Sequence, residues 1–178
     1  MLIEGDEQIY AFDRDNRVFR IPRVKFLDRN DPTHKLHLSD TLIDTEMIIE
    51  QLDGGQNMPR MLIYDIMTLR GEDVGQRPFD YRFDLIQRQL IEPRIEAMKA
   101  GRLIRERECM SVRRKDFYLA EVTHKLFDPA FIVNLRHDMD GLIFQPCSIV
   151  SVWGWGYWWS NSSELNRNPI PALYPRKV

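Results

Sequence analysis

The stretch TLIDTEMIIEQLDGGQNMPRMLIYDIMTL, residues 41–69, decides the fold. β-Branched and aliphatic residues dominate 41–52 and 60–69, and these residue types favour strands. Between them, DGGQN (53–57) carries two glycines with Asp and Asn, which are the residues that turn a chain. The stretch therefore predicts a β-hairpin.

The neighbouring segments add both strands and a helix. QIYAF and RVFRI flank DRDN (13–16), which predicts another hairpin. FDYRFDLIQRQLIEPRIEAMKAG (79–101) changes to helical spacing, with Asp80 expected to cap its start and Gly101 to end it. Pro93 lacks an N–H donor, so it should kink this helix or divide it in two.

Three further segments complete the first 146 residues. CMSVRRK (109–115) predicts a strand, DFYLAEVTHKLF (116–127) a helix capped by Asp116, and GLIFQ (141–145) a buried strand. Because hairpins and helices are mixed along the chain, the predicted fold class is α+β in a domain over residues 1–146.

The last segment, residues 147–178, differs in composition. It holds all four tryptophans, interrupted by glycines and followed by prolines, and no helical or strand period lasts. A divergent, unstructured tail is expected there. The chain as a whole has a formal net charge of −2, so it has no global basic field for non-specific binding of nucleic acid. Its two cysteines form no CxxC pair, and no run approaches the roughly 20 apolar residues that span a bilayer.

Two carboxylates mark the strand predicted at 41–52. Side chains alternate between the faces of a strand, so Asp44 and Glu46 should share one face. An unpaired buried carboxylate is costly, so both must face water, a cation or a polar ligand. A partly exposed strand face with a Lys or Arg partner is the alternative interpretation.

Other candidate residues lie near predicted strands. In HDMDGLIFQP (137–146), Asp138 and Asp140 share a face, and hard divalent cations prefer such oxygen ligands, although Asp-Gly is also an ordinary turn. Asp65 is a carboxylate within a strand. The ring of Tyr64 beside it could stack on a base or simply pack in the core.

The order and spacing of several segments resemble a known family. FDRDNRVFRIP, HLSDTLIDTEMII, PRMLIYDI, PFDYRFDLIQRQLIEPRIEAMK, SVRRKDF and HDMDGLIFQP are similar to the nucleotidyltransferase domain of metazoan-type mRNA capping enzymes, the RNA guanylyltransferases. The resemblance runs from Met1 to about Pro146. It implies the fold shared with ATP-dependent DNA ligases, in which antiparallel sheets with flanking helices surround a nucleotide cleft.

The resemblance also implies an activity and partners. In that family a lysine attacks the α-phosphate of GTP, becomes linked to GMP, and passes GMP to a 5′-diphosphate RNA end. The implied partners are GTP, the 5′-diphosphate end of nascent mRNA and the C-terminal tail of RNA polymerase II. The implied location is the nucleus, and the implied cofactor is Mg²⁺ or Mn²⁺.

Site residues follow from the matching motifs. The resemblance places Glu46 beside the ribose of the nucleotide, Tyr64 on the guanine ring and Lys115 as a donor to the guanine O6. Asp44 would contribute to substrate binding. Asp140 would bind the divalent metal and, with Glu46, serve catalysis.

The chain departs from the family pattern at three places. The family's nucleophile lies in a Lys-x-Asp-Gly motif before the segment that matches MLIEG, whereas the look-alike QLDG (51–54) has Gln51 in place of lysine. The lysine-rich strand expected after DGLIFQP is absent. The family's Asp-Gly-Glu reads Asp44–Thr45–Glu46. We therefore expect an incomplete guanylyltransferase domain that is inactive by itself.

Three alternatives remain open at this point. The chain could be a non-catalytic module that binds GTP, an RNA end or a protein. It could be a ligase-type adenylyltransferase fragment on the same fold, although SVRRKDF and the long segment at 79–101 favour capping. It could also be a fragment without function.

Overall fold

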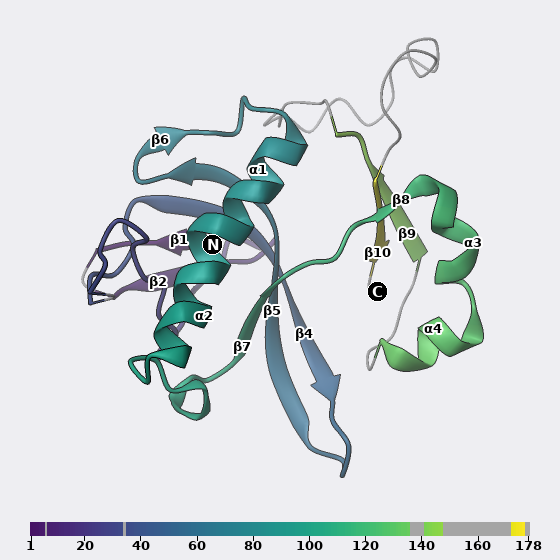
Figure 1. Cartoon of the computed structure of the whole chain (residues 1–178), viewed down its shortest axis with the longest axis horizontal. Coiled ribbons are helices and arrows are strands. Elements are labelled where there is room, and N and C mark those ends of the chain that lie inside the picture. Colours follow the sequence, from purple (N-terminus) through teal and green to yellow (C-terminus); the bar gives the residue numbers. More distant parts are fainter. Residues whose placement is uncertain (6, 34, 136–140, 148–171, 177–178) are drawn as a thin grey trace.

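The computed structural model describes residues 1–5, 7–33, 35–135, 141–147 and 172–176, and its centre is the hairpin of β4 (Thr41–Gln51) and β5 (Asn57–Leu69) (Figure 1). The two strands pair antiparallel along their length, which confirms the predicted hairpin. Gly54 and Gly55 have φ angles of 88° and 77° in the turn, a backbone conformation that glycine adopts without steric cost.

The other strands of the large sheet extend from this hairpin. The order is β3-β2-β1-β4-β5-β6, with β7 paired to β5. The bounds of the added strands are β1 (Leu2–Ile3), β2 (Ile9–Phe12), β3 (Val18–Arg20), β6 (Glu72–Asp73) and β7 (Ser111–Arg114). The antiparallel pairing of β2 with β3 confirms the hairpin around DRDN, and β7, which runs parallel to β5, confirms the strand expected at 109–115.

Strand β5 has two more residues than the matching part of β4. The consecutive β4 residues Leu42 and Ile43 pair with Thr68 and Ile66, which skips Met67. Likewise Asp44 and Thr45 pair with Asp65 and Ile63, which skips Tyr64. Met67 and Tyr64 are thus the extra residues of two β-bulges, which bend the strand and redirect side chains. The bulges also explain why Ile63 and Ile66, which are three residues apart, are both fully buried.

One interrupted helix covers a face of the large sheet (Figure 1). It consists of α1 (Phe79–Leu85), the π-helical turn η1 (Ile86–Ile91) and α2 (Glu92–Lys99). Pro93 lies in the first turn of α2, directly after the π turn, so the predicted division of the helix is confirmed. Gly101, with φ 68°, donates its N–H to the carbonyl of Met98 and ends the helix as expected.

The expected cap at Asp80 is wrong. The N-cap residue is Pro78, with no side-chain cap, and Asp80 lies in the first turn, where its charge complements the helix dipole. The short 3-10 turn η2 (Arg105–Arg107) follows the helix. No helix within the described part of the chain is long and apolar enough to cross a membrane.

The main hydrophobic core lies between the large sheet and these helices. It draws on β1, β2, β4, β5, the segment before β4, the helices, and the residues just after β6 and just before β7. Sixteen buried side chains form it: Ile3, Ile9, Val24, Phe26, Leu38, Ile43, Met61, Ile63, Ile66, Leu69, Val74, Leu85, Ile86, Leu90, Ile91 and Met110. A mixed sheet flanked by helices confirms the α+β class.

A second, smaller unit lies beyond β7 (Figure 1). Its three-stranded sheet has the order β8-β10-β9. The bounds of its elements are β8 (Tyr118–Leu119), the 3-10 turn η3 (Ala120–Val122), α3 (Thr123–Leu126), α4 (Pro129–Asn134), β9 (Gly141–Gln145) and β10 (Ala172–Arg176).

Two expectations in this unit need correction. The segment 116–127 is not one helix capped by Asp116, because it begins with β8 and becomes α-helical only at Thr123. Phe117 packs against α1, and the centroid of its ring lies 4.9 Å from that of Phe79 and 5.0 Å from that of Phe83. Strand β9 is present but not buried, since Phe144 is 50% exposed in this thin sheet.

Part of the expected tail is also described. Residues 172–176 form β10, which pairs antiparallel with both β9 and β8, and nothing in the sequence indicated this strand. Residues 148–171 and 177–178 lie outside the described residues. The domain boundary at Pro146 and the unstructured character of the rest of the tail stay predictions.

Candidate functional site

Three adjacent strands bring four of the predicted site residues together. Asp44 and Glu46 come from β4, where they stand opposite Asp65 and Leu62 of β5. Because the extra residues of the bulges lie in β5, the alternation of β4 is kept and the two carboxylates share a face. Asp140 and its neighbour Asp138 lie outside the described residues, so their predicted places stay predictions.

Lys115 reaches this face from the end of β7. Its backbone N–H donates to the carbonyl of Ile63 at 2.8 Å, which extends the parallel pairing of β7 with β5 by one residue. Its Nζ forms an ion pair with Oε2 of Glu46. The Lys115 side chain is only 5% exposed, and a buried ammonium needs such a partner because its desolvation is costly.

This ion pair fits the simpler interpretation of Glu46, and its role toward a nucleotide stays a prediction. The carboxylate does have a lysine partner on a partly exposed strand face, as the structural alternative required. That lysine is also the residue that the family resemblance placed against the guanine. An ammonium group has three donors, so one ion pair does not by itself use the whole donor capacity of Lys115.

Tyr64 is the extra residue of the bulge next to Asp44. Burial is the main cause that raises the pKa of the Tyr64 phenol, and the negative charge of Asp44 and a hydrogen bond to it raise this pKa further. The phenol therefore stays protonated and donates to the Asp44 carboxylate, which also accepts the Thr45 N–H at 3.0 Å. The bulge thus places an aromatic ring and a carboxylate side by side.

Sequence reasoning missed one residue that supports the site. Arg82 of α1 is 1% exposed and donates from Nε and Nη2 to the two carboxylate oxygens of Asp65, at 2.7 and 2.9 Å. It also donates to the carbonyl of Arg77. The detectable sign was its helical spacing, since Arg82 follows Phe79 by three residues and so lies on the apolar face of the helix.

The described residues do not hold a divalent cation by themselves. No group of three His, Cys, Asp or Glu side chains within them could bind a metal ion. Asp44 and Glu46 are already engaged by Tyr64 and Lys115. A metal site here would need further ligands, and the predicted ligand Asp140 is not among the described residues.

Comparison with known proteins decides the family. The sequence profile of "mRNA capping enzyme, catalytic domain" matches residues 1–154. The chain belongs to the mRNA capping enzyme family. This membership confirms the resemblance inferred from the motifs, and the match continues past Pro146.

Individual relatives agree with the family assignment. An mRNA-capping enzyme of Caenorhabditis elegans is 48% identical over 145 residues, which are 80% of this chain and 23% of the relative. One of Danio rerio is 44% identical over 146 residues, which are 82% and 24% of the two chains. The mRNA-capping enzyme subunit alpha of Schizosaccharomyces pombe is 29% identical over 143 residues, 79% and 35%. The chain spans about a quarter of the length of the two animal capping enzymes.

Proposed function

We propose that this chain is the nucleotide-binding part of a capping guanylyltransferase, with the nucleotidyltransferase fold shared with DNA ligases. The proposed substrates are GTP and the 5′-diphosphate end of nascent RNA. The observation that carries the proposal is the convergence of Glu46, Tyr64 and Lys115 from three strands in a chain of the capping family. Aromatic, acidic and cationic groups are what a purine, a ribose hydroxyl and a carbonyl oxygen require.

Each residue has a physical task in this proposal. The ring of Tyr64 stacks on the guanine, because a flat aromatic face accepts a base. Lys115 donates to O6 of guanine, a carbonyl oxygen that adenine does not have. The Glu46 carboxylate holds the Lys115 ammonium in place through their ion pair, and in this proposal it also accepts a hydrogen bond from a ribose hydroxyl.

The covalent step requires a nucleophilic lysine that is not among the residues of the candidate site. In the proposed reaction a lysine amine bonds to the α-phosphorus of GTP and pyrophosphate leaves. A terminal phosphate oxygen of the RNA then bonds to that phosphorus and the lysine is released. No lysine among the 178 residues is followed by x-Asp-Gly. We therefore propose that these residues bind and orient the nucleotide.

A divalent cation belongs to the proposal as well. Mg²⁺ or Mn²⁺, with Asp140 as a ligand, would supply positive charge against the triphosphate. The nucleus and the C-terminal tail of RNA polymerase II are the proposed location and protein partner. They rest on family membership alone.

Nucleotide titration tests the proposal. The chain should bind GTP more tightly than ATP, by about 10- to 100-fold, since a hydrogen bond from a charged group contributes roughly 1.5–3 kcal/mol. The double variant Lys115→Met/Glu46→Gln removes the donor without leaving a buried carboxylate unpaired, and it should lose this preference. Lys125→Met, which changes an exposed lysine of α3, is the matched control and should keep it.

Other outcomes would favour the alternatives. A preference for ATP would indicate the ligase-type adenylyltransferase. Equal affinity for the two nucleotides, or no affinity for either, would remove the assigned role of Lys115. A last experiment extends the chain by an upstream Lys-x-Asp-Gly segment, the downstream lysine strand and the domain that follows. If the original chain binds GTP but the extended chain takes up no label from α-labelled GTP, the non-catalytic module is the correct alternative.

A further inference from the structure

Strand β7 carries Lys115 to the candidate site, although its own composition specifies its position weakly. Among the described strands it pairs with β5 alone, in a short parallel ladder. Of the four residues SVRR (111–114), only Val112 is apolar. A hydrophobic face normally sets the register of a strand, and a strand without such a face slips more easily. Another contact must therefore fix the register of β7.

A buried polar cluster of three residues lies at the start of this ladder. Arg60 of β5 forms an ion pair from Nη2 to Oε2 of Glu50 on β4, and both side chains are buried. The Nε of Arg60 donates to Oγ of Ser111 on β7 at 3.0 Å. Ser111 is buried as well, and it stands directly opposite Arg60 in the ladder. A planar guanidinium holds its partners in fixed directions, so Arg60 ties three strands together.

The same three strands form the candidate nucleotide site. Glu46 lies four residues before Glu50 on β4, and Lys115 lies four residues after Ser111 on β7. Because β4 is antiparallel to β5 and β7 is parallel to it, both steps run in the same direction along the sheet. The Glu50–Arg60–Ser111 cluster and the Glu46–Lys115 ion pair therefore cross-link the same strands at two levels, four residues or about 13 Å apart.

A slip of β7 along β5 would move Lys115 away from Glu46. A slip by one residue turns each side chain to the opposite face, and a slip by two residues shifts the strand by about 7 Å, which no hydrogen bond spans. Both two-residue slips are unfavourable at Arg60. One brings Arg113 opposite Arg60, so that two like charges meet, and the other replaces the hydroxyl by the thiol of Cys109, which is a weak acceptor.

The burial of charge in this cluster needs a reason other than stability. Replacing a buried ion pair by apolar side chains of similar volume is often neutral or stabilising, because desolvation offsets much of the attraction. The best-attested use of a buried polar group is to select one register among several. Arg60 fits this use, because it stands beside the strand whose register is otherwise weakly specified.

We propose that Glu50, Arg60 and Ser111 are positioning residues for Lys115. They fix the register of β7 on β5 and thereby hold the Lys115 ammonium beside Glu46. The selection of guanine through Lys115 rests on the proposed function, whereas the effect of the cluster on the position of Lys115 does not.

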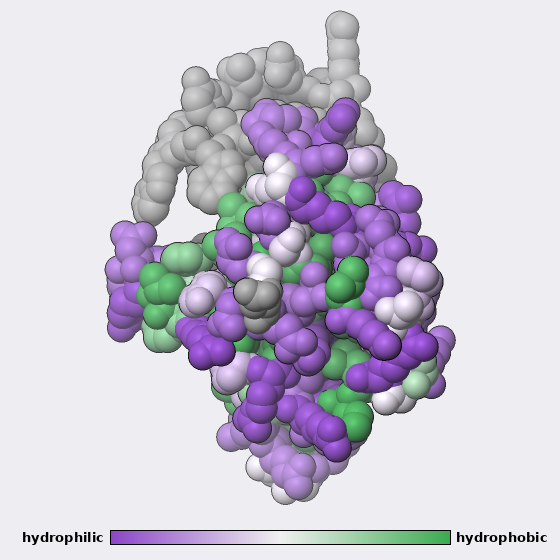
Figure 2. All heavy atoms as spheres, turned by 90° about the vertical axis from the view of Figure 1, so that its left-hand side faces the viewer, coloured by the Kyte–Doolittle hydropathy of each residue, from purple (hydrophilic) through white to green (hydrophobic). Residues whose placement is uncertain are grey.

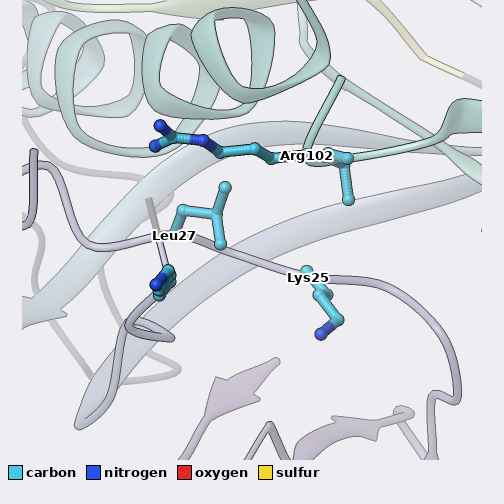
Figure 3. A pocket seen from close by; sticks show the side chains of 5 residues that line it. Lys25, Leu27 and Arg102 are labelled. Atoms are coloured by element: carbon cyan, nitrogen blue, oxygen red, sulfur yellow. The ribbon is translucent and has the colours of Figure 1, made fainter. Parts of the chain in front are cut away.

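An ion pair remote from β7 provides the control. Arg70, directly after β5, donates from Nη2 to Oδ1 of Asp28 at 2.6 Å, and both side chains are partly exposed. Asp28 follows Leu27, which lines the surface hollow shown in Figure 3 together with Arg102 from the segment after α2. This hollow is on the side of the large sheet remote from β8, β9 and β10 (Figure 1), where hydrophilic residues predominate (Figure 2). Loss of the pair perturbs the fold away from the candidate site.

Lysine labelling measures the position of Lys115 without a nucleotide. Reductive methylation to a low extent, followed by mass spectrometry of peptides, gives its reaction rate relative to that of Lys125, which is exposed. Lys115 of the wild type should react slowly, because it is buried and paired with Glu46. Ser111→Ala removes one hydrogen bond from a charged donor, so the population with β7 displaced, and with it the relative rate, should rise about ten-fold or more.

Two double variants separate positioning from stability. Glu50→Leu/Arg60→Met removes the whole cluster and should raise the relative rate further, while the urea midpoint changes little. Arg70→Met/Asp28→Asn should leave the relative rate unchanged even where it lowers the urea midpoint. A circular dichroism spectrum checks the fold of each variant, and Ser111→Ala alone decides the question if Glu50→Leu/Arg60→Met does not fold.

Nucleotide titration then tests the link to guanine. The probes are GTP and 2-aminopurine riboside triphosphate, whose base lacks O6. The ratio of the two affinities should fall toward one in Ser111→Ala and in Glu50→Leu/Arg60→Met, because a displaced Lys115 no longer donates to O6. The ratio should stay at its wild-type value in Arg70→Met/Asp28→Asn.

Three results would overturn the proposal. The cluster does not position Lys115 if the relative labelling rate is unchanged in Ser111→Ala, or if it rises as much in the control as in the cluster variants. Faster labelling with an unchanged affinity ratio would separate the position of Lys115 from guanine selection. A wild type without preference for GTP over the analogue would instead remove the role of Lys115 in the proposed function, and the labelling rates would still decide whether the cluster positions this lysine.

Discussion

Arg82→Met should destabilise the domain more than any ordinary surface change. Arg82 is 1% exposed, and it donates to both oxygens of Asp65, to the Arg77 carbonyl and, at 3.4 Å, to that of Gly75. Its guanidinium also lies 5.7 Å from the centroid of the Phe79 ring. Methionine fills similar volume but leaves the Asp65 carboxylate, 13% exposed, without its cation.

The expected cost follows from that burial. Removing one partner of a buried ion pair costs about 3–5 kcal/mol, because the other charge stays buried and uncompensated. For a domain of this size, 1 kcal/mol corresponds to about 2–4 °C, so the midpoint of thermal unfolding should fall by about 6–20 °C. Arg82→Lys keeps the charge but loses the bidentate geometry, so it should lie between the wild type and Arg82→Met.

Urea unfolding followed by far-ultraviolet circular dichroism measures this cost. The matched control is Arg88→Met, which breaks an exposed pair with Asp84 on the same interrupted helix and should cost less than about 0.5 kcal/mol. A double-mutant cycle with Asp65→Asn isolates the coupling. If Arg82→Met and Arg88→Met cost the same, or if the effects of Arg82→Met and Asp65→Asn simply add, the reasoning is refuted.

Three further predictions concern ionisation and the candidate site. Burial lowers the pKa of His37, whose Nε2 accepts the Phe26 N–H at 3.1 Å, so the folded state binds fewer protons than the unfolded state. The stability that His37 contributes is therefore present above about pH 6.5 and lost as the pH falls below it. His37→Gln should flatten the dependence of the unfolding midpoint on pH between 5 and 7, and an unchanged slope would contradict this. The raised pKa of Tyr64 predicts that Tyr64→Phe leaves the ultraviolet titration of tyrosine unchanged up to pH 10, and a loss of amplitude below that pH would place Tyr64 among the exposed phenols. Lys115→Met should destabilise the chain by about 3 kcal/mol in urea unfolding because it strands Glu46, and Lys115→Met/Glu46→Gln should recover most of this loss; failure to recover would mean that packing of the Lys115 stem dominates.

The strands of the large sheet were largely predictable, and the bulges were not. Residues 41–69 contain strong strand formers around a glycine turn, so local preference and final structure agree. The positions of the two extra residues of β5 depend on how β5 pairs with β4 and packs on the helices. The sequence of one strand does not indicate either of these contacts. The prediction of one helix over 116–127 failed for a related reason. Phe117 packs on α1, and this tertiary contact outweighs the helical spacing of the segment.

The candidate site was predictable where motifs carried it. Asp44, Glu46, Tyr64 and Lys115 were proposed from matching motifs, and the structure brings them together, although their roles toward a nucleotide stay predictions.

Because Tyr64 is the extra residue of a bulge, β5 can lose this residue without a change in the pairing of the sheet. Deleting one residue from a central strand normally shifts every later side chain to the wrong face. Deleting Tyr64 would instead make Ile63 and Asp65 consecutive, opposite the consecutive residues Thr45 and Asp44, so the ladder would close without a slip. The same deletion at Ile63 would remove a core side chain. The extra residue is therefore dispensable for the architecture of the sheet, and a chain shortened by this one residue would keep the sheet while losing the aromatic ring beside Asp44.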